Sequence, residues 1–67
     1  MTTLGEAYPK EQARVREMLA AGLSIGPVGM FYVAVCRAVL READEAAISG
    51  DLPRMIRAYK AMHEVER

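Results

Sequence analysis

The chain has 67 residues, of which nine are basic and nine acidic, so it carries no net charge at pH 7. This length allows one small domain over residues 1–67 with a marginal core, since a short chain buries a small share of its surface. One cysteine excludes an intrachain disulfide, and one histidine excludes a Cys/His zinc site within the chain. We therefore expect a second subunit to support the fold, and the balanced charge disfavours electrostatic binding of nucleic acid.

The first part of the chain divides into a tail and a short helix. Residues 1–7 contain threonine and glycine without an apolar period, which predicts a loose tail. Pro9 suits the first turn of a helix, and helix-forming residues follow it. Apolar side chains with helical spacing lie at Val15, Met18 and Leu19. The pattern predicts a helix over residues 9–21, with Gly22 as its left-handed C-cap.

Two further helices are predicted after a short connection. Pro27 opens the second, which we expect over residues 27–48, and Gly50 ends it. Asp51 is a good N-cap for the third helix, expected over residues 52–65. The apolar stripe of the third helix consists of Leu52, Met55, Ile56, Tyr59 and Met62. No strand-like alternation occurs, so the sequence predicts an all-α fold: a short N-terminal helix, then an antiparallel hairpin of a long and a short helix.

The first half of the predicted second helix is apolar almost all the way round, although a surface helix needs only one apolar stripe. One face can pack on the third helix: Val33, Cys36, Leu40, Ala43 and Ala47. We expect another face to form a homodimer interface, because too few helices remain to cover it. This face contains Val28, Phe31, Tyr32, Val35 and Ala38. The alternative is that the first helix and residues 23–25 cover it.

The stretch from residue 18 to residue 36 has no charged side chain and is nearly long enough to cross a bilayer. Gly26 and Pro27 interrupt it, and the helices on both sides have stripes of the kind that pack in soluble folds. The sequence therefore favours a cytoplasmic protein. A small membrane protein is the weaker alternative.

The sequence offers no convergent set of catalytic groups. His63 is expected at the edge of the apolar stripe, and Cys36 is expected to pack inertly among valines. Three acidic residues of the second helix are expected to form a solvated face: Glu42, Asp44 and Glu45. Within it we expect an ion pair between Arg41 and Glu45, one turn apart. We therefore expect no enzymatic activity, no metal and no cofactor.

Basic residues recur every three positions on the third helix, at Arg54, Arg57 and Lys60. A short glycine-containing turn precedes them, as in a helix-turn-helix protein that reads DNA with its second helix. The residues between them are apolar or aromatic, whereas base readout usually adds Ser, Thr, Asn or Gln. We therefore expect either a solvated basic face or a surface that binds an acidic protein partner, in preference to DNA. If a partner binds here, the residues expected to contact it are Arg54, Arg57, Tyr59 and Lys60.

Three segments resemble a known group of proteins: residues 25–31 (IGPVGMF), 43–52 (ADEAAISGDL) and 55–59 (MIRAY). They are similar to small helical proteins from the early regions of tailed phages and prophages, among them quorum-sensing anti-activators of transposable Pseudomonas phages. The resemblance implies a homodimer that blocks a host transcriptional regulator, the DNA-binding domain of a LuxR-type quorum-sensing activator. It also implies action on the type IV pilus assembly ATPase and host takeover in the bacterial cytoplasm. A small helix-turn-helix-like DNA-binding regulator is the alternative.

Overall fold

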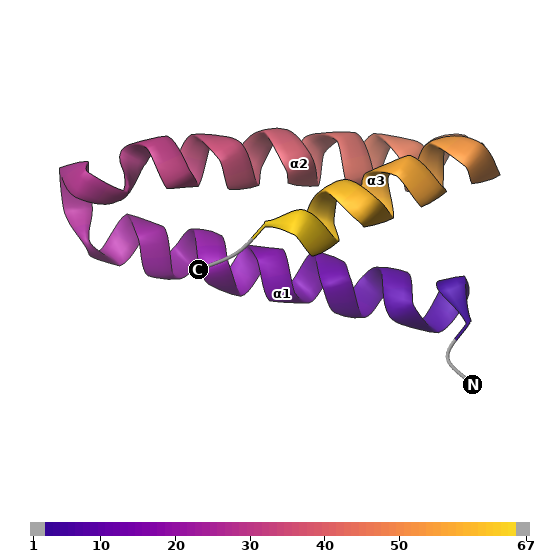
Figure 1. Cartoon of the computed structure of the whole chain (residues 1–67), viewed down its shortest axis with the longest axis horizontal. Helices are drawn as coiled ribbons and strands as arrows, with labels where there is room; N and C mark the ends of the chain where they lie inside the picture. Colours follow the sequence, from indigo (N-terminus) through magenta and orange to yellow (C-terminus); the bar gives the residue numbers. More distant parts are fainter. Residues whose placement is uncertain (1–2, 66–67) are drawn as a thin grey trace.

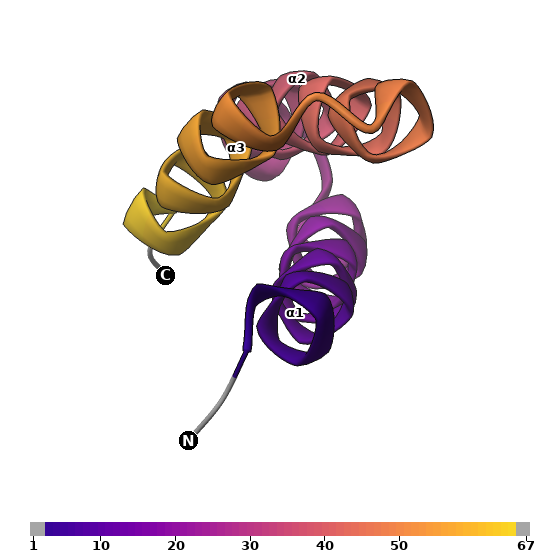
Figure 2. The ribbon, with the colours of Figure 1, turned by 90° about the vertical axis from the view of Figure 1, so that its right-hand side faces the viewer.

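The computed structural model describes residues 3–65, which form three α-helices and one 3-10 turn. The elements are α1 (Leu4–Ser24), η1 (Gly26–Gly29), α2 (Met30–Ser49) and α3 (Leu52–Glu64). Helices α1 and α2 run antiparallel along each other, and α3 folds back over part of their length (Figure 1). The view from one end shows α3 on one side of the α1–α2 pair, crossing α2 at an angle (Figure 2). The predicted all-α class is confirmed.

The N-terminal helix begins earlier than predicted. Thr3 caps it, because its side-chain oxygen accepts a hydrogen bond from the backbone N–H of Glu6 at 3.2 Å. The helix therefore starts at Leu4, and a loose tail over residues 1–7 is wrong from that residue onward; residues 1 and 2 lie outside the described part of the chain. Pro9 lies inside α1, more than one turn after its start, where it cannot donate a helical hydrogen bond. The residue before it, Tyr8, is buried in the core and donates a hydrogen bond to the carbonyl oxygen of Ala43 at 2.7 Å, which fixes this part of the helix on α2.

The connection between α1 and α2 also differs from the prediction. Gly22 is buried within α1 and does not cap it. The position needs glycine for another reason: a Cβ atom there would lie 2.9 Å from a methyl group of Val33. The helix continues to Ser24, and the left-handed residue is Gly26, with φ of 76°. Residues 26–29 then form the tight 3-10 turn, so α2 begins three residues later than expected. The glycine that looked like a cap instead allows two helices to approach closely.

The turn between α2 and α3 matches the prediction. Gly50 adopts the left-handed conformation with φ of 71°, which ends α2. The side chain of Asp51 accepts a hydrogen bond from the backbone N–H of Arg54 at 3.2 Å and caps α3. Pro53 occupies the first turn, where its missing N–H costs no helical bond.

All three helices contribute to the core. The buried apolar residues are Tyr8, Val15, Met18, Val33, Cys36, Leu40, Ala43, Ala46, Ala58, Met62 and Val65. The predicted inner face of α2 is buried except at Ala47, whose place is taken by Ala46. The stripe of α3 is rotated from its predicted position, and Leu52 and Ile56 are exposed. Small Ala58 faces inward instead, which lets the backbone of α3 come close to its neighbours.

Candidate functional site

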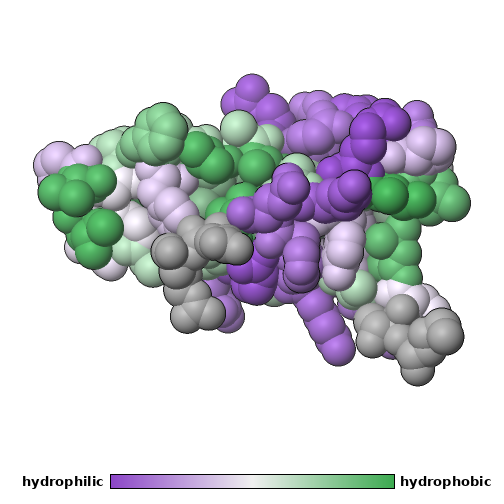
Figure 3. Space-filling view, in the orientation of Figure 1, coloured by the Kyte–Doolittle hydropathy of each residue, from purple (hydrophilic) through white to green (hydrophobic). Residues whose placement is uncertain are grey.

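The face predicted to form a dimer interface lies on η1 and the first half of α2, and it is largely uncovered. Val28 is 88% exposed and Phe31 is 83% exposed, while Val35 and Ala38 are also exposed and Tyr32 is half-buried. Helix α1 and residues 23–25 therefore do not cover it. Figure 3 shows hydrophobic surface at both ends of the molecule, with hydrophilic surface between them. The uncovered face of α2 belongs to the end where α1 and α2 are connected.

A groove of about 440 Å³ lies beside this face. Its walls are Phe31, Tyr32, Val35 and Val39 from α2, and Ala61, Glu64 and Val65 from the end of α3 and the residue after it. The groove exists because α3 has 13 residues and α2 has 20, so α3 stops before it reaches the first turns of α2. Tyr32 also borders a second apolar hollow on the α1 side, which extends the open surface.

Arg54 is not free to bind a partner, unlike the other basic residues of α3. Its guanidinium contacts the carboxylate of Glu42 at 2.7 Å and that of Glu45 at 3.3 Å, which ties α3 to α2. The hydrogen bond from Arg54 lowers the pKa of Glu42. The predicted pair of Arg41 with Glu45 is absent from the ion pairs within residues 3–65, because Glu45 turns toward α3 instead.

The remaining predicted partner residues share the outer surface of α3. Arg57 and Lys60 are exposed, and neither makes an ion pair within the described part of the chain. The ring of Tyr59 stacks between those of Tyr8 and His63, with centroids 6.5 and 6.2 Å away. A shallow hollow of about 190 Å³ is lined by Tyr59, Lys60, His63 and Glu64. The exposed side chains of Leu52 and Ile56 add apolar surface to the same helix.

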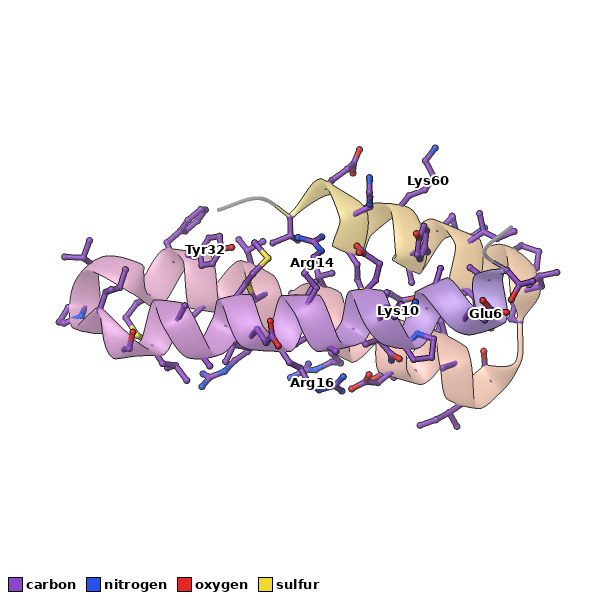
Figure 4. The ribbon with its side chains drawn as sticks, turned by 90° about the horizontal axis from the view of Figure 1, so that it is seen from below. Glu6, Lys10, Arg14, Arg16, Tyr32 and Lys60 are labelled. Carbon is purple, nitrogen blue, oxygen red and sulfur yellow. The ribbon has the colours of Figure 1, made fainter. Side chains whose placement is uncertain are left out.

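Arg14 joins α1 to the end of α3, a role that the sequence analysis missed. Its guanidinium donates hydrogen bonds to the carbonyl oxygens of Met62 at 2.7 Å and Val65 at 3.2 Å. The same guanidinium forms an ion pair with the carboxylate of Glu11 at 2.9 Å. Figure 4 shows Arg14 directed toward the end of α3, while Arg16 points to the opposite side of α1. Only the spacing of three between Glu11 and Arg14 was visible in the sequence, and it predicts no contact with α3.

Acid is expected to weaken the fold partly through Glu11. The hydrogen bond from Arg14 lowers the pKa of Glu11 from its ordinary value of 4.5, so the folded chain binds this proton more weakly than the unfolded chain does. The resulting stabilisation is complete above the ordinary value and is lost as the pH falls through the lower folded-state pKa. Between about pH 5 and pH 3, the melting temperature of the wild type should therefore fall more steeply than that of Glu11→Gln.

The matched control is Glu17→Gln, since Glu17 is exposed on the same helix and has no ion pair within residues 3–65. This variant should keep the wild-type dependence of melting temperature on pH. Parallel curves for the wild type and Glu11→Gln would show that Glu11 does not contribute to the acid response.

The acidic residues of α2 serve as links between helices. Besides the contacts of Arg54, Asp44 accepts hydrogen bonds from Arg16 at 3.0 Å and from the side-chain amide of Gln12 at 2.8 Å. The three carboxylates are 41–56% exposed, as expected of a solvated face, and they also connect α2 to the other two helices. Within residues 3–65, no three His, Cys, Asp or Glu side chains gather as a cation site.

Cys36 lies where the sequence predicted it, whereas His63 is more exposed than the predicted edge of the apolar stripe would make it. Cys36 is fully buried in the core, and burial raises the pKa of its thiol, which disfavours the reactive thiolate. His63 is 72% exposed at its side chain and lies at the edge of α3, with Nδ1 3.6 Å from a carboxylate oxygen of Glu11. The two side chains therefore belong to separate environments.

Comparison with known proteins leaves the family open. No protein-family model, no curated protein and no solved structure matches the chain. Within residues 3–65, no helix combines the length and the apolar character needed to cross a bilayer.

Proposed function

We propose that this chain is a non-enzymatic protein antagonist, which acts by occupying the surface of a host protein. The observation that supports the proposal is the outer surface of α3. It combines the exposed apolar side chains of Leu52 and Ile56 with the cations Arg57 and Lys60, neither of which makes an ion pair within residues 3–65. Apolar contacts flanked by unpaired charges are typical of surfaces that bind other proteins. An acidic partner surface fits them best.

A protein partner accounts for α3 better than DNA does. The first of its three regularly spaced cations, Arg54, is held by Glu42 and Glu45 and is withdrawn from any phosphate. The exposed neighbours of the other two, Leu52 and Ile56, cannot hydrogen-bond to base edges. The whole chain carries no net charge, whereas DNA-binding domains are usually basic.

The resemblance to phage anti-activators selects the first target to test: the DNA-binding domain of a LuxR-type quorum-sensing activator. The type IV pilus assembly ATPase is the second. An antagonist of this kind binds its target in a fixed ratio and catalyses no reaction. Its effect on host transcription should therefore reach its maximum when every target molecule has its binding site occupied. Calorimetric titration of the purified LuxR-type domain measures both the ratio and the affinity.

The double substitution Arg57→Glu with Lys60→Glu should weaken this binding by at least about tenfold, because it opposes an acidic partner with acidic side chains. The fold should be unaffected, since both residues are exposed and unpaired within the described residues. Arg54 is left unchanged, because Glu at that position would face Glu42 and Glu45 and disturb the fold.

The matched control is Lys10→Glu with Arg41→Glu, which makes the same change in net charge on α1 and α2. Both residues are exposed, and neither makes an ion pair with another residue of the 3–65 range. This control should change the affinity by less than about twofold. Equal losses for the two double variants would show that net charge alone matters. Salt-dependent binding to duplex promoter DNA, in place of protein, would support the helix-turn-helix alternative.

A further inference from the structure

The end of the molecule that connects α1 to α2 exposes an unusual amount of apolar surface. Six large apolar side chains within 13 residues are exposed there: Leu23, Ile25, Val28, Met30, Phe31 and Val35. Together they expose on the order of 600 Å², at the upper limit for the largest patch of a monomer and near the roughly 800 Å² that each partner buries in a stable interface.

The arrangement of this surface is self-complementary. Phe31 projects from α2 with 83% of its surface exposed, and it borders the groove of about 440 Å³ left by the short α3. A projecting ring and an apolar groove thus lie side by side on one face. Two copies related by a two-fold axis can each place their ring in the groove of the other, which is the geometry of an isologous contact.

We infer that a second copy of this chain covers the face, with α2 antiparallel to α2 and Phe31 of each copy in the other's groove. The face runs from Val28 to Ala38, which places the two-fold axis near its middle, close to Ala34. An antiparallel contact centred between Ala34 and Val35 sets the large ring of Phe31 opposite the small side chain of Ala38. Both Ala34 and Ala38 are exposed in the single chain, so they allow close approach of the two helices.

The charges of the molecule favour a second copy at this face and exclude one at the outer surface of α3. A two-fold contact brings each surface against itself, so charges near the axis meet charges of the same sign. The six exposed apolar side chains at this end of the molecule are uncharged, and the one charged residue that lines the groove is Glu64, on its α3 wall. By contrast, self-contact on α3 would oppose Arg57 and Lys60 to their own copies. The dimer is therefore independent of the proposed antagonist function and leaves those cations available.

Sedimentation equilibrium of the full chain, from micromolar to several hundred micromolar, tests the inference. The wild type should have twice the mass of the 7.4-kDa chain. Phe31→Asp should raise the dissociation constant at least about 100-fold, because two carboxylates would be buried in apolar grooves. Ile48→Asp is the matched control, since Ile48 is 87% exposed at the opposite end of α2. It should leave the dimer intact.

Three results would overturn the inference. A wild-type monomer at every concentration would leave no role for the second copy. Dissociation by Ile48→Asp together with an intact Phe31→Asp dimer would move the contact to the other apolar end. A mass that keeps rising with concentration would indicate head-to-tail assembly rather than a closed pair. Circular dichroism verifies that both variants stay helical, which their exposure predicts.

Discussion

Gly29→Ala is expected to lower the free energy of unfolding by about 3 kcal/mol, enough to unfold much of the population of so small a domain. A methyl group on Gly29 would overlap the backbone carbonyl oxygen of Gly22 and lie 2.8 Å from Cγ1 of Ile25. A carbonyl cannot rotate away as a side chain can, so α1 and the 3-10 turn would have to separate. Gly29 has φ of −87° and ψ of 0°, a negative-φ conformation that is allowed for alanine, so the main cost is one of space.

Urea unfolding followed by circular dichroism measures this effect, with Gly5→Ala as its control. Gly5 lies in the first turn of α1, and the nearest atom to an added methyl group there is the side-chain oxygen of Thr3 at 3.8 Å. Because alanine favours helices, this variant should be more stable than the wild type by about 0.5–1 kcal/mol. Unchanged stability of Gly29→Ala would mean that the close approach of Gly22 and Gly29 does not hold α1 and the 3-10 turn together in solution.

Arg14→Met is expected to destabilise the fold by about 2 kcal/mol, since it removes charge-assisted hydrogen bonds while keeping an apolar stem of similar length. The carbonyl oxygens of Met62 and Val65 would lose their donor, and Glu11 would lose its cation. Hydrogen exchange should rise first at the amides in the last turn of α3. Unfolding in urea gives the size of the loss.

Arg16→Met separates this role from the general effect of removing an arginine from α1. Arg16 pairs with Asp44 at 3.0 Å, but both side chains are about half exposed, so the pair contributes about 0.5 kcal/mol or less. Equal losses for Arg14→Met and Arg16→Met would contradict the linking role of Arg14. Faster exchange confined to α3 in the Arg14 variant would support it.

Local signals were enough to predict the α2–α3 hairpin. Gly50, Asp51 and Pro53 follow one another, and each acts on the backbone within its own turn, so no distant contact is needed to interpret them. The start of α1 has a similar signal in Thr3 and Glu6, which are spaced as in a capping box and favour the observed start. Pro9, taken as a first-turn residue, predicts a start five residues too late.

The glycines of the first connection could not be interpreted from the sequence alone. A glycine after a helical stretch predicts a left-handed cap, and the same residue type permits two backbones to approach closely. Gly22 serves the second purpose because α2 returns along α1, which is a property of the assembled fold. Arg14 was missed for the same reason: its acceptors lie 48 and 51 residues away in the chain.

The candidate surfaces were predicted unevenly. The excess of apolar residues at the start of α2 indicated an uncovered face, and Val28 and Phe31 are indeed exposed. The basic residues of α3 were grouped by their spacing, which ignores what lies across the turn. Across the turn, Glu42 and Glu45 of α2 form ion pairs with Arg54, the cation nearest the turn. They form no ion pair with the two cations farther along α3, Arg57 and Lys60. Charges on neighbouring helices therefore decide which members of a periodic set stay available.

The fixed position of Val65 has a practical consequence for engineering the chain. Arg14 donates a hydrogen bond to the carbonyl oxygen of Val65, and Val65 also lines the groove beside Phe31. A protein fused after the last residue would therefore start within a few residues of that groove. Thr3 caps α1 at its other end, far along the molecule from the connection between α1 and α2 beside which the groove lies (Figure 1). Affinity tags and fluorescent labels therefore belong at the N-terminus, where they leave the groove unobstructed.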